Sequence, residues 1–203
     1  MSIEHMALQV AQPAEMVHWW FATGFLIIGL LLFAEAIVGS EVWARRAWRK
    51  YLWPSFLFGM GVFMWPVMTF FTNSAIHMVA HGTWAQFLML AGAAELGVAR
   101  GKLHSQYWRL CSAAAMLVSG TALLVHEQQA WLFARAAFLH HTLGWTMIVG
   151  SIFPIAQAIR PRSLTAAAGF ASVFVVTAVM LFCDRDSAAI FGHFSQYAGV
   201  AHR

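Results

Sequence analysis

The side chains in this chain with the types and spacing needed to bind a metal ion are mostly histidines. They are His77, His81, His126, Glu127, His140 and His141. The first two are spaced i, i+4, which on a helix places their Cβ atoms about 6 Å apart on one face. An all-imidazole site suits copper, zinc or iron, and copper is the favoured metal here. The pattern therefore predicts a site of three or four imidazoles with one carboxylate.

Glu127 and the adjacent pair His140 and His141 each have more than one interpretation. Glu127 could bind the metal directly, orient a metal-binding histidine from behind, or cap a helix end; it could also pair with Arg135. If the protein is an enzyme, Glu127 would be its base. His140 and His141 point about 100° apart on a helix, so only one is expected to face the interior.

The composition sets the environment in which such a site would lie. Of 203 residues, 61% are hydrophobic and 10% are charged, against roughly 25% charged residues in typical soluble domains. The length allows about six spans of ~20 residues each with short connections. We therefore expect a single membrane domain and no separate soluble domain.

Six apolar stretches predict an all-α fold, a polytopic membrane helix bundle of about six transmembrane helices. The predicted spans are residues 17–39, 52–72, 75–98, 110–125, 137–159 and 164–183. Together they form a transmembrane domain over residues 17–183. An N-terminal arm (1–16) precedes it and a C-terminal tail (184–203) follows it. The arm has no Lys or Arg, which argues against a cleaved signal peptide.

Basic residues predict the orientation of the bundle. The loops after the first, third and fifth spans hold nine of the twelve Lys and Arg residues, so these loops are expected on the cytoplasmic side. Both termini would then be extracytoplasmic, in a multi-pass protein of the bacterial inner membrane. Nine of the ten histidines, all but His104, would lie toward the outer side. Cys111 and Cys183 fall in opposite halves of the membrane, so no disulfide between them is expected.

Several other intramembrane residues have both a functional and a structural interpretation. Met60, Met64 and Met68 form a thioether stripe that could guide copper, although helix packing is the favoured role for methionine. Glu35 and Glu95 lie near basic loops, where pairing or snorkelling is expected. A stripe of small residues on the fourth span favours close helix packing: Ser112, Ala115, Ser119 and Ala122.

Four short segments resemble a group of small bacterial inner-membrane proteins. They are Leu124-Val125-His126-Glu127-Gln128, Phe138-Leu139-His140-His141, Asp184-Arg185-Asp186 and Phe191-Gly192-His193. The likeness runs from about His77 to the C-terminus, and it implies no particular activity. In general plan the chain is also similar to copper-resistance membrane proteins of the CopD kind, which place histidines on the periplasmic side.

These observations leave several functions open. The favoured one is metal homeostasis or transfer, with copper bound at the periplasmic side and a periplasmic metal or electron-transfer protein as a partner. A second is a b-type cytochrome whose haem is held by His77 or His81 against His140. A metal-dependent membrane enzyme and an accessory subunit of a respiratory complex are the others. No motif supports nucleotide or nucleic-acid binding.

Overall fold

The computed structural model describes residues 3–71, 75–125 and 134–183, and over these ranges it is all-α without any strand. The elements are α1 (Ile3–Val38), α2 (Ser40–Ala44), η1 (Arg49–Tyr51), α3 (Leu52–Phe71), α4 (Ala75–Ala99), η2 (Gln106–Arg109), α5 (Leu110–Val125), α6 (Ala134–Gly150), α7 (Ile152–Ile159) and α8 (Leu164–Phe182). The predicted helical fold class is thereby confirmed. The predicted N-terminal arm is not separate from the first span, because α1 begins at Ile3 and includes both.

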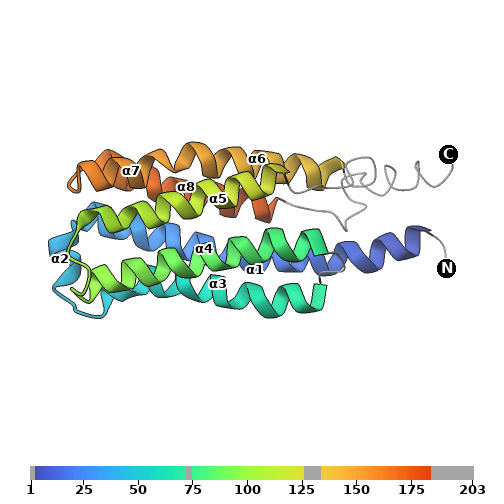
Figure 1. The fold of residues 1–203 in the computed structure, drawn as a ribbon, viewed down its shortest axis with the longest axis horizontal. Coiled ribbons are helices and arrows are strands. Elements are labelled where there is room, and N and C mark those ends of the chain that lie inside the picture. Colours follow the sequence, from blue (N-terminus) through green and yellow to red (C-terminus); the bar gives the residue numbers. More distant parts are fainter. Residues whose placement is uncertain (1–2, 72–74, 126–133, 184–203) are drawn as a thin grey trace.

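The long helices form one closed bundle (Figure 1). Each packs against the next along the chain, in the order α1, α3, α4, α5 and then α6 continued by α7. The last helix, α8, packs against both α6 and α7 and closes the ring against α1. Because successive helices alternate in direction, α1, α4 and α6 run parallel to one another and occupy alternate places in the ring.

Four stretches are long and apolar enough to cross a membrane, judged by length and composition over the described residues. They are Met16–Val38, Gln106–Val125, Phe138–Ile159 and Leu164–Phe182. The chain is therefore a multi-pass integral membrane protein. The second and third predicted spans form α3 and α4, which are 20 and 25 residues long and pack within the same bundle. That these two also cross the bilayer stays a prediction.

The fifth predicted span is not one helix. It divides at Ser151 into α6 and α7. Pro154 explains the division, because proline has no N–H for the carbonyl of Gly150 four residues earlier, and its ring crowds that carbonyl. The last helix begins as its sequence indicates: the Ser163 hydroxyl accepts a hydrogen bond from the backbone N–H of Ala166 at 3.2 Å, a helix N-cap.

Helices α5 and α6 approach each other closely where two glycines face. A Cβ added to Gly120 would lie 2.6 Å from the carbonyl oxygen of Gly144, and one added to Gly144 would lie 2.9 Å from that of Gly120. No side chain fits between the two backbones, which is the small-residue packing common between membrane helices. This contact fixes the position of α6 at Gly144, which lies one helical turn after His140.

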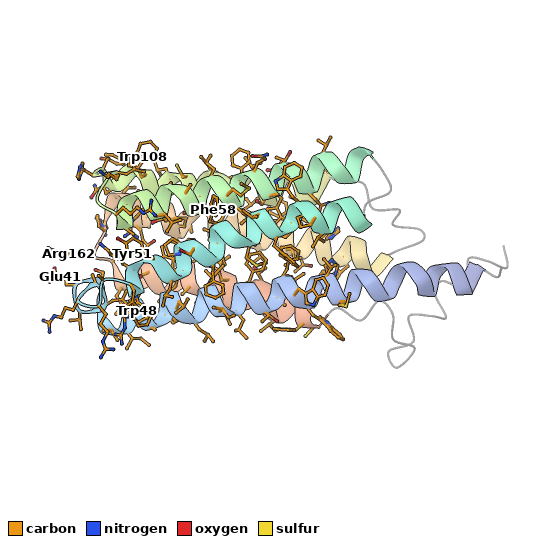
Figure 2. The ribbon with its side chains drawn as sticks, turned by 90° about the horizontal axis from the view of Figure 1, so that it is seen from below. Glu41, Trp48, Tyr51, Phe58, Trp108 and Arg162 are labelled. Atoms are coloured by element: carbon orange, nitrogen blue, oxygen red, sulfur yellow. The ribbon has the colours of Figure 1, made fainter. Side chains whose placement is uncertain are left out.

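The two ends of the bundle differ in chemistry. The loops that carry most of the basic residues lie together at the end with α2, and Figure 2 shows Glu41, Trp48, Tyr51 and Arg162 there. We call this the basic end. In the same region the Arg49 guanidinium stacks 5.2 Å from the centre of the Trp43 ring, a cation–π contact. We call the opposite end, at which α4 and α6 begin, the histidine end.

Candidate functional site

Three histidines from three different helices meet near the histidine end. His18 lies on α1, His81 on α4 and His140 on α6. The ring of His140 lies between the other two, with its centroid 6.4 Å from that of His18 and 6.5 Å from that of His81. His140 is buried, whereas His18 and His81 are partly buried. We call these three residues the histidine triad.

The triad follows from the topology of the bundle. Its three helices run parallel and alternate around the ring, and each carries its histidine toward the end from which it enters the bundle. One inward-facing residue on each such helix therefore reaches the bundle axis at a similar depth. The sequence separates His18 from His140 by 122 residues, and the closure of α8 onto α1 brings α1 near α6.

The six predicted metal-binding residues have different outcomes in the structure. His81 and His140 are brought together in the triad. His141 is exposed and points away, so His140 is the member of that pair that faces the interior. His77 lies on α4, but its side chain is outside the described residues. His126 and Glu127 also lie outside them, so their part in the predicted site stays a prediction.

His18 is the member that the sequence pattern missed. It stands alone on its span, and only the pairs and clusters of histidines had been singled out. The signal that points to it is its position, just inside the first span and toward the same side as the other histidines. A single histidine on a long apolar helix is costly in a bilayer unless it faces the interior of the protein.

Aromatic side chains pack directly beneath the triad. The Trp84 ring lies 6.4 Å from that of His81, one turn along α4. Phe21 and Phe25 of α1 pack against Trp84 with ring centroids 5.9 and 6.1 Å away. This layer lies between the histidines and the rest of the bundle core.

The triad has imidazole groups that could bind a metal ion, but their rings lie farther apart than the rings of two histidines bound to one ion. Among the described residues, no three His, Cys, Asp or Glu side chains already stand at metal-binding positions. Two imidazoles on one tetrahedral ion, with metal–nitrogen bonds of about 2.0–2.1 Å, would have ring centroids about 5 Å apart. The separations of 6.4 and 6.5 Å are wider. Binding one ion through these rings would therefore require them to move closer together.

The methionines of α3 have a packing role in the bundle. Met60 and Met64 are buried in the core. The thioether of Met60 occupies the space above Gly24, where a Cβ would overlap its sulfur. Met68 lies on the same helix, but its side chain is outside the described residues. This contact supports the packing interpretation over a copper route.

A second polar group of residues lies toward the basic end. The Ser112 hydroxyl donates to the Glu95 carboxylate at 3.2 Å, and Glu95 is 5% exposed. The Trp53 indole N–H donates to Glu35 at 3.1 Å. Arg109 attracts both carboxylates electrostatically. The hydrogen bonds that the structure gives these carboxylates are with Trp53 and Ser112, and direct pairing with a basic residue stays a prediction.

A comparison of the chain with protein-family models, curated proteins and solved structures finds no match in any of the three. The resemblance to small bacterial inner-membrane proteins therefore stays a prediction.

Proposed function

We propose that this integral membrane protein binds a transition metal ion, copper, through His18, His81 and His140. The observation that carries the proposal is the position of His140, buried between two histidines of other helices at nearly equal distances. Imidazoles from three separate helices would form a site that depends on the folded bundle. Polar side chains in such positions of membrane proteins are generally functional.

The donor set supports copper as the metal. Neutral imidazole nitrogen binds copper strongly, and the order of metal affinities places Cu²⁺ above Zn²⁺ and Fe²⁺. The ion would enter from the histidine end. If the basic loops are cytoplasmic, this end faces the periplasm, and the protein would serve metal homeostasis or transfer at the bacterial inner membrane. His77, His126 and Glu127 would be candidates for additional ligands.

A b-type haem is the second candidate, and one observation favours it. Two imidazoles on opposite faces of one haem iron have ring centroids about 6 Å apart, which is close to both separations in the triad. A haem would use His140 and one other histidine, leaving the third without a role. It would also need the space next to the triad that Trp84, Phe21 and Phe25 fill. The metal-ion proposal uses all three histidines and displaces none of these rings.

Metal analysis and an absorption spectrum of one purified sample separate the two candidates. The metal-ion proposal expects about one copper per chain after exposure to copper, with no Soret band. A sample that contains iron and shows a strong Soret band would establish the haem. A sample that takes up neither copper nor zinc and shows no haem would exclude both.

A further inference from the structure

Two neighbouring loops at the basic end carry five arginines. A Cβ added to Gly29 of α1 would meet Ala171 and Val175 of α8. These two helices run antiparallel, so the residues just after α1 lie beside the residues just before α8. Figure 2 shows Glu41 and Arg162, one from each loop, close together. We call the five residues the arginine surface: Arg45, Arg46, Arg49, Arg160 and Arg162.

Two tryptophan rings hold Arg49 in place. Its guanidinium carbon lies 5.2 Å from the centre of the Trp43 ring and 5.8 Å from that of Trp48. Trp43 is buried and anchors the pair, whereas Trp48 is exposed. A cation–π contact uses none of the N–H donors of the guanidinium. These donors therefore remain able to bind an oxygen ligand, with the position of the charge already set.

The positive charge of the arginine surface is not balanced by acidic neighbours. Four of the five arginines are exposed, and none of the five forms an ion pair within residues 3–71, 75–125 and 134–183. Glu35 and Glu95 accept hydrogen bonds from Trp53 and Ser112 instead. Glu41 is the one exposed carboxylate that the described part of the chain places at this end. The excess of positive charge favours binding of an anion.

Exposed apolar side chains border the arginine surface. Ile37 and Val38 are exposed at the end of α1. Ile159 and Leu164 are exposed on either side of the loop that precedes α8. An anion bound at the arginine surface would thus have apolar surface beside it along the helices. A phospholipid combines a charged phosphate with hydrocarbon chains in this way, whereas a free phosphate has no apolar part.

We propose that the arginine surface binds the headgroup of an anionic phospholipid, whose acyl chains lie along the ends of α1 and α8. Arg49 and Arg162 would donate to the phosphate oxygens, because the guanidinium fork matches phosphate geometry. A basic residue near an anionic lipid surface strengthens binding by about fivefold. Neither arginine belongs to the histidine triad, so lipid binding here is independent of the metal ion.

The test offers the full chain two lipids that differ only in charge. The protein in neutral detergent is incubated with equal amounts of phosphatidylglycerol and phosphatidylcholine of the same acyl chains, and native mass spectrometry counts the retained lipids. The wild type should retain at least about fivefold more phosphatidylglycerol. Arg49→Gln combined with Arg162→Gln should bring the two lipids toward parity. The matched control, Arg100→Gln with Lys102→Gln, removes the same charge from the loop between α4 and α5 and should keep the preference.

Three results would overturn lipid binding at the arginine surface. The first is equal retention of the two lipids by the wild type. The second is a preference that survives in the Arg49 and Arg162 variant, or that the control loses equally. The third is displacement of phosphatidylglycerol by inorganic phosphate, compared with sodium chloride of the same ionic strength, which would assign the site to free phosphate.

Circular dichroism shows whether each variant keeps its helical content. If the combined variant does not fold, Arg162→Gln alone decides the question, because Arg162 is exposed in a loop and its loss should still lower the preference. Copper binding without a lipid preference would leave the metal proposal standing. A lipid preference in a protein that binds no metal would leave the arginine surface standing.

Discussion

The imidazole rings of His18 and His140 lie 6.4 Å apart at an interplanar angle of 78°, although α1 and α6 are the first and fifth long helices of the bundle. Closure of the ring by α8 makes this contact possible, because α8 packs against both α1 and α6. The candidate metal site therefore exists only in the fully assembled bundle, and the residue that completes it comes from the first span.

His18 should accordingly contribute to metal affinity as His81 and His140 do. We expect His18→Ala to weaken copper binding by more than about tenfold, because it removes an imidazole donor. The measurement is a competition titration with a copper chelator of known affinity. His104→Ala is the matched control, because His104 is exposed in the loop between α4 and α5 at the basic end. Equal affinities for the two variants would exclude His18 from the site.

The sequence predicted the helices of this bundle better than it predicted the site. The fourth predicted span, residues 110–125, coincides with α5, and the sixth ends within a residue of α8. These bounds were readable because apolar runs end at polar or capping residues. The division of the fifth span at Ser151 was not predicted, since the residues on either side of it are apolar.

The membership of the triad could be read from the sequence only in part. Lipid-facing and interior-facing positions are both apolar in a membrane helix, so the pattern of a span does not reveal which face points inward. His81 and His140 were singled out because they lie in histidine pairs. The choice between His140 and His141, and the addition of His18, required knowledge of which helices are neighbours in the ring.

The contact between Gly120 and Gly144 should control the position of α6. We expect Gly120→Ala to destabilise the protein by about 1–3 kcal/mol, because its Cβ would press on the carbonyl of Gly144. Gly59→Ala is the control: nothing lies within 4 Å of its added Cβ, and alanine should favour the helix by up to about 1 kcal/mol. Thermal unfolding in detergent measures both. A Gly120→Ala protein as stable as Gly59→Ala would contradict the close packing of α5 and α6.

The orientation predicted from the basic loops can be tested by chemical labelling. In a background with Cys111 and Cys183 replaced by serine, His104→Cys should react with a membrane-impermeant maleimide only after the cells are permeabilised. His141→Cys, exposed at the opposite end, should react in intact cells. Labelling of the first variant in intact cells, with protection of the second, would place the histidine end in the cytoplasm instead.

The most direct test of the metal site compares two adjacent histidines of α6. His140 is 7% exposed and lies between His18 and His81, whereas His141 is exposed on another face of the same helix. Copper content and affinity should be measured for the purified His140→Ala and His141→Ala proteins beside the wild type. We predict that His140→Ala loses the bound copper and that His141→Ala keeps it. Copper retained by His140→Ala, or lost equally from both variants, would contradict a site built on the histidine triad.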